Sequence, residues 1–329
     1  MTPVDVICVG TSVVDIPLQP VDRTVFDSVS YPVEDVSMRV GGDALNESIV
    51  LSKLGSRVGL VSAVGADAAG EFIIQTAREA GVDVTGVSVQ QRLTTSLNVG
   101  LVAPDGERTF ITNRNGSLWK TEESDIDVSG FLGSPGATEE TVVSAPRILA
   151  FGSIFNNPLL SGDWIARLFA AAKAVGMTIC ADMVPSRIGA GLDDIAEALG
   201  YVDYFFPNED EVIDLTGARD GAEAAATLLD KGVGTVVLKT GKRGCTLFTA
   251  GQEPISIPAF VRDDLDAIDT TGAGDNFAAG FIRALVDNKT PQECAVFANA
   301  VAAVSVGGLG ATSGVQSKAQ VDEFLASRS

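Results

Sequence analysis

The chain has 329 residues, 46% of them hydrophobic, which is enough for one large domain or two ordinary ones. Its 43 acidic and 23 basic side chains give a net charge of −20, and a field of that sign disfavours nucleic-acid partners. The sequence contains no histidine, so Ser-His-Asp hydrolysis and histidine zinc sites are excluded. Any proton transfer must therefore be carried by a carboxylate, a lysine or a cysteine.

Hydropathy and cysteine usage predict a cytoplasmic protein without a membrane segment. No apolar run reaches 18 residues, so a transmembrane helix is not expected. The N-terminal segment MTPVDVICVG lacks a basic stretch followed by a long apolar one, so it is not expected to be a signal peptide. The four cysteines form no CxxC pair, which predicts buried thiols in a reducing compartment: Cys8, Cys180, Cys245 and Cys294.

Apolar runs typical of buried strands alternate along the chain with helical patterns, several of which end in glycine. The predicted strands are Val4–Val9, Val58–Val61, Ile148–Phe151, Thr178–Ala181, Tyr204–Phe206 and Thr235–Leu238. The predicted helices are Ala44–Leu54, Gly70–Ala80, Trp164–Val175, Ala222–Leu229, Asp275–Val286 and Pro291–Val306. This alternation predicts an α/β fold with a mainly parallel central sheet flanked by helices.

Two segments interrupt this alternation. Residues 13–40 are polar, with short alternating runs, and residues 92–114 are typical of a β-hairpin around a turn at Pro104-Asp105-Gly106. We expect these two segments to form a small β lid inserted into an α/β domain made of residues 1–12, 41–91 and 115–329. Surface loops without a special role are the alternative.

The first candidate site residues follow the first strand and a pair of glycines. Asp15 is predicted to be an exposed carboxylate near the carboxyl end of a strand, where α/β sheets bind ligands, although a solvated loop aspartate is an alternative. Gly41 and Gly42 let a ligand approach the backbone closely, and Asn46 can both donate and accept hydrogen bonds, as sugar hydroxyls require. A plain loop-to-helix junction is the alternative, and in either case Asp43 is expected to cap the helix.

The sharpest signal is the string Asp269-Thr-Thr-Gly-Ala-Gly-Asp275 ahead of a predicted helix. Its glycines allow a tight turn, after which the free amides of the first helical turn attract an anion. A carboxylate at such a site fits the task of accepting a proton from an attacking hydroxyl while the amides hold a phosphoryl group. An aspartate that only caps the helix is the alternative. Neither GxxxxGK[ST] nor a helix-opening GxGxxG is present, so Walker-type and dinucleotide-binding sites are not expected.

The string DTTGAGDNFAAGF resembles the C-terminal signature of the PfkB (ribokinase-like) carbohydrate kinases, and Gly41-Gly42-Asp-Ala-Leu-Asn46 resembles their N-terminal signature. The resemblance covers nearly the whole chain. It implies a ribokinase-like fold and an ATP-dependent kinase that phosphorylates a hydroxyl of a small sugar. It also implies that Asp275 is the catalytic base and that an anion hole is formed by Gly272, Ala273 and Gly274.

The resemblance further implies how the nucleotide and metal ions are held. Asn208 and Glu211 match an Asn-x-x-Glu motif that organises Mg²⁺ through its water shell, which suits a cation that prefers oxygen ligands and keeps its waters. Asp269 and Thr271 resemble a monovalent-cation site for K⁺. The nucleotide is expected to meet a strand-loop and a later helix, at Thr240, Gly241, Gly244 and Asn299.

On the sugar side, the resemblance implies that Asp15 grips two substrate hydroxyls, together with Gly41, Gly42 and Asn46. The hairpin segment ending at Arg114 resembles the Glu-Arg-x-Phe…Arg pattern of fructokinases and 2-keto-3-deoxygluconate kinases, so Arg114 is expected to contact a carboxylate or hydroxyl of the sugar. Pairing of Arg114 with an acidic neighbour is the alternative. Relatives often pair two lids, which predicts a homodimer through the lid.

Three alternatives to a neutral-sugar kinase stay open. A nucleoside kinase shares the fold and the base, but it usually offers aromatic side chains for the purine, and the lid region has few of them. A catalytically silent sugar-binding regulator would have no chemical need for Asp275. A phosphosugar kinase would want basic side chains in the lid, where several arginines are available: Arg23, Arg39, Arg92, Arg108 and Arg114.

Overall fold

The computed structural model describes residues 3–103, 108–132, 146–260 and 269–328. In these residues nine strands form one large sheet. From edge to edge its strands are β14 (Ile255–Ile257), β13 (Cys245–Thr249), β12 (Thr235–Lys239), β11 (Tyr204–Phe205), β10 (Thr178–Met183), β9 (Ile148–Ile154), β1 (Val6–Gly10), β5 (Val58–Gly65) and β6 (Asp83–Gln90). All neighbours from β12 to β6 are parallel, whereas β13 and β14 join antiparallel.

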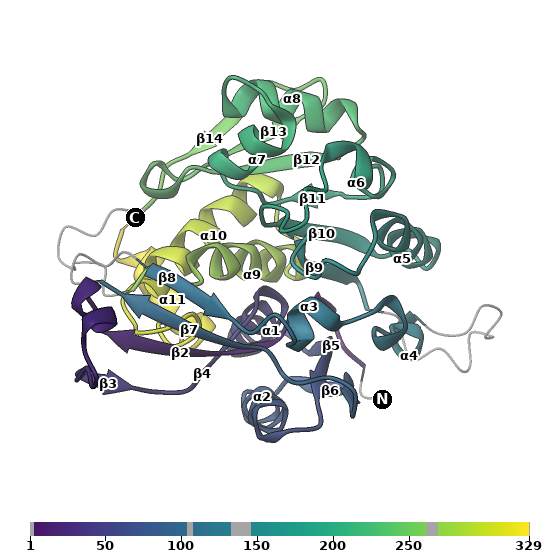
Figure 1. The fold of residues 1–329 in the computed structure, drawn as a ribbon. Coiled ribbons are helices and arrows are strands. Elements are labelled where there is room, and N and C mark those ends of the chain that lie inside the picture. The colour runs from purple at the N-terminus through teal and green to yellow at the C-terminus, as the bar shows by residue number, and fades with distance from the viewer. Residues whose placement is uncertain (1–2, 104–107, 133–145, 261–268, 329) are drawn as a thin grey trace.

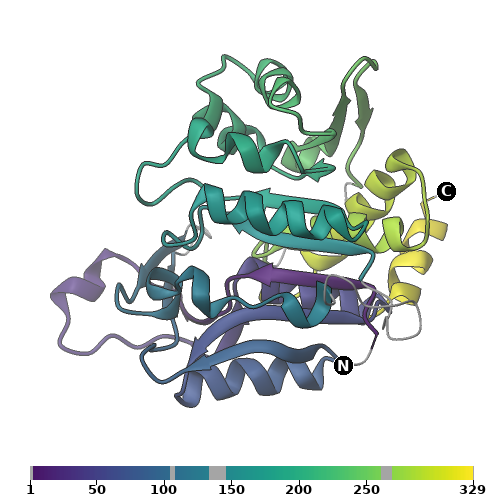
Figure 2. The same ribbon diagram turned by 90° about the vertical axis from the view of Figure 1, so that its right-hand side faces the viewer.

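Helices cover both faces of the large sheet, because its central strands are apolar on both sides. In β1 the side chains of Val6 and Cys8 belong to one buried cluster and those of Ile7 and Val9 to the other. The first face packs against α1 (Asp43–Lys53), α2 (Ala68–Glu79), α9 (Ala273–Val286), α10 (Pro291–Ser305) and α11 (Lys318–Ala326). The second packs against α5 (Gly162–Ala174), α6 (Leu192–Leu199), α7 (Glu209–Thr216) and α8 (Gly221–Asp230). Figure 2 shows α5 running beside the strands.

A smaller sheet lies to one side of the large one (Figure 1). Its strand order is β3-β2-β7-β8, with β4 also paired to β2. The bounds are β2 (Val13–Gln19), β3 (Asp35–Val36), β4 (Arg39–Gly41), β7 (Leu97–Val102) and β8 (Arg108–Thr112). The pair β7–β8 is antiparallel, as the hairpin prediction required, and the turn predicted at 104–106 lies outside the described residues. We call these five strands the small sheet.

Short elements connect these layers. They are the helices α3 (Ser117–Lys120) and α4 (Ser129–Leu132) and the 3-10 turns η1 (Arg23–Asp27), η2 (Glu123–Asp125) and η3 (Gly241–Arg243).

The predicted fold class is confirmed, including a mainly parallel sheet flanked by helices and a second small sheet. Each predicted strand and helix is present, with ends shifted by a few residues. The sequence interpretation missed β6, β13, β14, α6, α7 and α11. The half-buried residues of β6 show no clean alternation because it is an edge strand of the sheet. All four cysteines are buried free thiols, as predicted.

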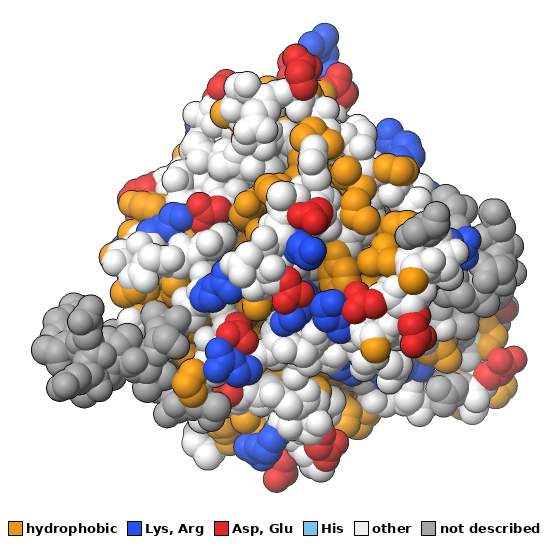
Figure 3. Space-filling view, turned by 180° about the vertical axis from the view of Figure 1, so that it is seen from behind, with side chains coloured by type: hydrophobic (Ala, Val, Ile, Leu, Met, Phe, Trp, Pro, Cys, Tyr) orange, Lys and Arg blue, Asp and Glu red, His pale blue; other side chains and the backbone are white. Residues whose placement is uncertain are grey.

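Two observations bear on surfaces. No helix within the described ranges is both long and apolar enough to cross a bilayer. Figure 3 shows acidic and basic side chains interspersed on the back of the molecule, so the net charge of −20 does not gather there into one acidic patch.

The topology brings the candidate site residues to one edge. The carboxyl ends of parallel strands meet at the same edge of a sheet. Here that edge includes the ends of β1, β9, β10 and β12, and the amino ends of α1 and α9 lie beside it.

Candidate active site

The start of helix α9 is a backbone cradle. Gly272 precedes it with φ +70°, and a Cβ atom at this position would lie 2.6 Å from the Cβ of Ala311. Both the left-handed backbone conformation and the lack of space therefore require glycine here. The amide of Ala273 donates to the carbonyl oxygen of Thr270 (3.2 Å), whereas the amides of Gly274 and Asp275 have no backbone acceptor among the described residues. Of the three residues predicted to form the anion hole, Ala273 thus has its amide engaged, whereas the amides of Gly274 and Asp275 stay available to an anion.

Asp275 lies in the first turn of α9 and joins the two glycine-rich segments. The Asn46 amide Nδ2 donates to its Oδ2 over 2.7 Å, across a sequence separation of 229 residues. Burial raises the pKa of the Asp275 carboxyl well above its ordinary value, and the neighbouring Asp43 carboxylate raises it further. A carboxylate with a raised pKa is a stronger proton acceptor once ionised, which suits a general base.

Asp43 does not cap α1, contrary to the sequence prediction. The N-cap is Gly42, with φ +92°, and no side chain caps the helix. The Asp43 carboxylate instead accepts hydrogen bonds from the Ser153 hydroxyl and, at 3.3 Å, from the Asn156 amide. Ser153 has φ +65°, a strained conformation for a non-glycine residue, and such strain often marks functional sites. The local sequence offered no signal for these contacts, because Ser153 and Asn156 lie more than 100 residues from Asp43 along the chain.

Asp15 lies within β2 of the small sheet and is half-buried, so the prediction of an exposed carboxylate after the first strand was wrong. Its Oδ1 accepts from the amide Nδ2 of Asn98 on β7 (2.9 Å), whose own Oδ1 accepts from Thr112 (2.8 Å). Burial raises the pKa of Asp15. A Cβ at Gly41 would collide with the Asp15 carboxyl, so that glycine makes room for it. Asn98 is a site residue that the sequence interpretation missed.

Arg114 follows β8 in a turn and is exposed. Its guanidinium lies over the Trp119 ring, 5.4 Å from the centroid, and the Arg187 guanidinium lies 5.8 Å from the same centroid. Within the described residues it forms no ion pair with an acidic side chain, so the acidic-neighbour alternative does not hold there. Arg187 also reaches Asn156 Oδ1 (3.4 Å), which connects this basic group to Asp43.

The loop after β12 is a closed turn. Thr240 donates to the Gly244 carbonyl oxygen through its amide (2.8 Å) and its hydroxyl (3.0 Å). Gly241 has φ +58° and open space around its Cα, whereas Gly244 packs against the Ile257–Ala259 backbone. Asn299 is buried, and its Nδ2 donates to the carbonyl oxygens of Ile257 (3.2 Å) and Pro258 (3.1 Å). The donors of Asn299 are thus used within the protein.

The Asn208–Glu211 motif forms a capping box at the start of α7. Asn208 Oδ1 accepts from the Glu211 amide (2.9 Å), and Glu211 Oε2 accepts from the Asn208 amide (2.8 Å). Burial raises the pKa of Glu211 to about 7, with Asp182 as the next cause. Glu211 Oε1 and the second lone pair of Asn208 Oδ1 stay available after these bonds, so the two residues fit contact with Mg²⁺ or with its water shell. No group of three or more acidic or cysteine side chains in the described ranges is arranged to hold a metal ion.

Asp269 and Thr271, the predicted monovalent-cation pair, are adjacent. Asp269 Oδ1 accepts from the Thr271 amide (2.8 Å) and hydroxyl (2.6 Å), and its Oδ2 accepts from the Gly310 amide (2.8 Å). These bonds tie the turn before α9 to the loop after α10, which fixes the position of the cradle at Gly272.

Lys239, the last residue of β12, lies among the acidic groups of the site. Its Nζ is 2.6 Å from Asp182 Oδ2. Burial opposes the charge on Lys239, but the carboxylates of Asp182 and Glu211 outweigh it, so its pKa is raised. Glu47 is also buried here, and burial followed by repulsion from Asp275 raises its pKa well above the ordinary value.

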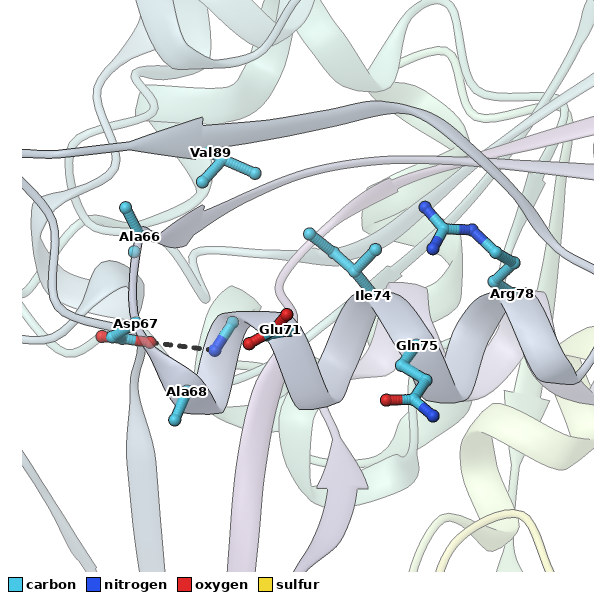
Figure 4. Close-up of a pocket in the computed structure, with 10 residues that line it drawn as sticks. Ala66, Asp67, Ala68, Glu71, Ile74, Gln75, Arg78 and Val89 are labelled. Carbon is cyan, nitrogen blue, oxygen red and sulfur yellow. Dashed lines mark hydrogen bonds between the residues drawn. The ribbon is translucent and has the colours of Figure 1, made fainter.

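Two hollows differ in their relation to these groups. A pocket of about 100 Å³ lies between the small sheet and the turns on either side of α9 and α10, and it is lined by Asp15, Arg39, Phe110, Thr271 and Gly310 among others. A larger, open groove of about 630 Å³ runs along α2 (Figure 4). It contains no predicted site residue, and its Asp67 carboxylate is used by the amides of Gly70 (2.9 Å) and Thr95 (2.8 Å). The smaller pocket, by contrast, is lined by three of the predicted site residues, Asp15, Asp269 and Thr271.

The sequence and the fold are similar to those of known proteins. The family model for pfkB family carbohydrate kinases matches residues 4–318. Ribokinase of Haemophilus influenzae is 28% identical over 89% of each chain, and the ATP-dependent ribose-1-phosphate kinase of Halopiger xanaduensis is 30% identical over 88% of this chain and 87% of its own. The crystal structure of ribokinase from Thermotoga maritima matches with a TM-score of 0.79 and 26% identity, covering 98% of this chain and 99% of that one. The chain belongs to the pfkB family of carbohydrate kinases.

Proposed function

We propose that this kinase transfers the γ-phosphoryl group of ATP to a hydroxyl of a small sugar, with Asp275 as the general base. The observation that carries the proposal is the position of Asp275 beside the open amides of α9, held by Asn46 at 2.7 Å. Its carboxylate takes the proton of the substrate hydroxyl as that oxygen attacks the γ-phosphorus and the bond to ADP breaks. The amides of Gly274 and Asp275 stabilise the negative charge that spreads over the phosphoryl oxygens.

The sugar is proposed to lie between the small sheet and the start of α1. Asp15, held by Asn98, lines the pocket from the small sheet. Gly41 packs against the Asp15 carboxyl, and Gly42 leads directly into α1, whose first turns carry Asn46. A carboxylate can accept hydrogen bonds from two adjacent hydroxyls, which favours a sugar over an apolar alcohol. Arg114, stacked on Trp119 beside Arg187, supplies the positive charge that would favour a sugar acid.

The nucleotide is proposed to lie along the loop after β12, at Thr240, Gly241 and Gly244, with Asn299 beneath it. Open space at Gly241 suits a close approach of phosphate or ribose to the backbone. Mg²⁺ would neutralise the phosphate charge and would be held through water by Asn208 and Glu211. K⁺ at Asp269 and Thr271 would act through the position of the cradle. The ATP-dependent relative from Halopiger xanaduensis supports ATP as the donor.

A nucleoside acceptor is the second candidate, because Phe110 lines the pocket next to Asp15 and offers an aromatic face. Aminoimidazole riboside kinase of Salmonella typhimurium, 28% identical over 88% of this chain, supports the same candidate.

The two candidates are separated by ratios of catalytic efficiency. ATP consumption would be measured with Mg²⁺ and each acceptor in turn: ribose, fructose, 2-keto-3-deoxygluconate, ribose 1-phosphate and adenosine. We expect one of the sugars or sugar acids to give the highest kcat/KM. Adenosine ahead by more than about tenfold, equivalent to about 1.4 kcal/mol of transition-state binding, would replace the sugar assignment by the nucleoside one. ATP consumption with none of a wider panel would contradict both.

A further inference from the structure

The buried pair Lys239–Asp182 joins the ends of two strands at the active-site edge. Lys239 is the last residue of β12, and Asp182 lies on β10, with β11 between them. The 2.6 Å contact leaves the side chains only 15% and 6% exposed, respectively. The second Asp182 oxygen accepts from the Met183 amide (2.8 Å), so this carboxylate is fixed from both sides. A pair so placed has a defined geometry rather than the mobility of a surface ion pair.

The Lys239 ammonium lies directly beside the start of α9. A Cβ at Gly274 would be 3.2 Å from Lys239 Nζ, and this is the one heavy atom within 4 Å that such a Cβ would meet among its described surroundings. Glycine at 274 therefore leaves room for the ammonium next to the amides that the proposed function assigns to the phosphoryl group. Among the described residues Asp182 is the acceptor of one Lys239 donor, and an ammonium has three.

The surrounding charges make this lysine unusual. The carboxylates that face the same space come from α1, β10, α7 and α9, and Lys239 is the single basic side chain among them in the described part of the chain: Asp43, Glu47, Asp182, Glu211 and Asp275. A triphosphate that enters this space is repelled by those of these carboxyls that are ionised and is attracted by Lys239 and the helix amides. One cation at the cradle is thus the main local attraction that the side chains offer to a transferring phosphoryl group.

A second lysine–aspartate pair provides an internal comparison. Lys173 Nζ contacts both oxygens of Asp203 at 2.7 and 2.6 Å, and Asp203 accepts from the Ile179 amide (2.7 Å) at the beginning of β10. This pair has the same shortest contact, 2.6 Å, as Lys239–Asp182 but is more exposed, and it lies at the amino ends of the strands, the edge opposite the active site. A lysine–aspartate pair at either edge of the sheet can hold neighbouring elements together, but of these two lysines only Lys239 faces the cradle.

We propose that Lys239 contacts the γ-phosphoryl group during its transfer and that Asp182 positions its ammonium for that contact. This inference rests on the proposed function. The oxygen of the substrate hydroxyl forms the new bond to phosphorus as its proton passes to Asp275, and the bond between the γ-phosphorus and the ADP oxygen breaks with its electron pair remaining on ADP. Lys239 exchanges no proton in this step. Its positive charge stabilises the negative charge on the phosphoryl oxygens, because an ammonium acts as a compact point charge and needs no particular orientation.

The test removes both charges at once. Lys239→Met alone leaves the buried Asp182 unpaired, which destabilises the fold, so the decisive variant combines Lys239→Met with Asp182→Asn. Affinities for MgATP and MgADP are measured by calorimetry, and kcat by product formation with the best acceptor of the panel. Asp182→Asn alone, which keeps an oxygen acceptor for the ammonium, tests positioning, and Lys173→Met is the matched control at the opposite edge.

The expected result is specific to the γ-phosphoryl group. In the double variant kcat falls by about a hundredfold, and the preference for MgATP over MgADP falls by about tenfold or more. Asp182→Asn shows a smaller loss of the same preference, which a merely structural role would not produce, and Lys173→Met retains wild-type values.

A double variant with wild-type kcat and an unchanged preference for MgATP would overturn this inference and leave the proposed function intact. A loss in Lys173→Met equal to that of the double variant would also overturn it, because the effect would then be one of stability. A wild-type chain that does not bind MgATP would overturn the proposed function itself, and the inference with it.

Discussion

The two sides of the proposed active site are built in different ways. On the phosphoryl side, backbone dominates: Gly272 turns at φ +70°, and the first amides of α9 face outward from a helix whose interior is fully packed. On the acceptor side, side chains hold one another: Asn98 holds Asp15 at 2.9 Å, and Ser153 and Asn156 hold Asp43. A backbone cradle needs a particular local sequence, whereas a network of side chains needs partners from distant segments. The first side therefore suits a fixed chemical step, and the second can vary with the substrate.

The largest expected effect breaks the phosphoryl side at its base. Asp275→Asn keeps the shape and the contact with Asn46 but removes the proton acceptor, so turnover should fall by at least about a hundredfold. Affinity for ATP should stay the same or improve, since a negative charge near the phosphates is lost. Steady-state kinetics and calorimetry measure both. Asp287→Asn, just beyond the other end of α9, is the control, and turnover near wild type in Asp275→Asn would remove the base assignment.

Gly272→Ala tests whether the cradle depends on backbone conformation and on space together. Gly217 has nearly the same φ, +67°, with open space around it, so Gly217→Ala should cost only about 1–2 kcal/mol of unfolding free energy for the left-handed conformation. Gly272→Ala adds the collision with Ala311, and we expect about 2–4 kcal/mol in total together with a loss of turnover. Denaturant unfolding compares the two variants. Equal costs would mean that the turn before α9 shifts freely and that the cradle is not rigidly built.

A change on the acceptor side should separate the substrates. Asp15→Asn removes the charge that would accept two sugar hydroxyls but keeps the shape of the side chain beside Asn98. We expect KM for the sugar to rise about tenfold, with KM for ATP unchanged. Asp22→Asn, an exposed cap of η1 next to the same sheet, is the matched control. An equal rise in both Michaelis constants would show that Asp15 supports the site as a whole rather than the sugar.

Between the two sides lies Glu47, buried at 2% exposure, and it predicts a dependence of stability on pH. Burial, and then Asp275, raise its pKa in the folded chain, so the folded chain keeps this proton to higher pH than the unfolded chain does. Raising the pH above the unfolded value of 4.5 therefore lowers the unfolding free energy. Glu47→Gln removes this loss, so its unfolding free energy should rise relative to wild type as the pH increases over the range above about pH 5.

Thermal unfolding at several pH values measures this gain. Glu293→Gln is the control of opposite sign, because hydrogen bonding with the Thr290 amide lowers the pKa of Glu293, and its difference from wild type should be flat over that range. If the difference in unfolding free energy between Glu47→Gln and wild type is also independent of pH, Glu47 does not titrate in isolation from its neighbours.

The same contrast explains what the sequence could predict. The cradle, the helix that follows it and the alternating core strands are written in contiguous residues, so their positions were predicted within a few residues. The contacts of Asp43 and the pairing of Asp15 with Asn98 depend on segments 83 to 113 residues apart, and no local pattern reveals them. Asp15 was assigned to the large sheet's edge because the chain leaves β1 only two residues before β2 begins, and a change of sheet within two residues leaves no turn signal. The pairing of Lys239 with Asp182 joins two strands 57 residues apart and likewise has no local pattern.

The smallest expected effect on catalysis concerns assembly of the small sheet. In the described residues β3 and β8 are its outer strands, and each leaves one edge unpaired, which proteins usually cover. Apolar side chains stand out on these strands, with Val36 61% and Ile111 54% exposed. Ile111 points away from the pocket that its neighbour Phe110 lines, because successive side chains of a strand alternate between faces.

We therefore expect a homodimer through the small sheet, with about twice the 34.0 kDa mass of one chain by light scattering at micromolar concentration. Ile111→Asp should yield monomers that keep turnover within about twofold, whereas Val175→Asp, at an exposed position beyond α5, should stay dimeric. A monomeric wild type would exclude this assembly, and a dimer that survives Ile111→Asp would place the contact on another surface.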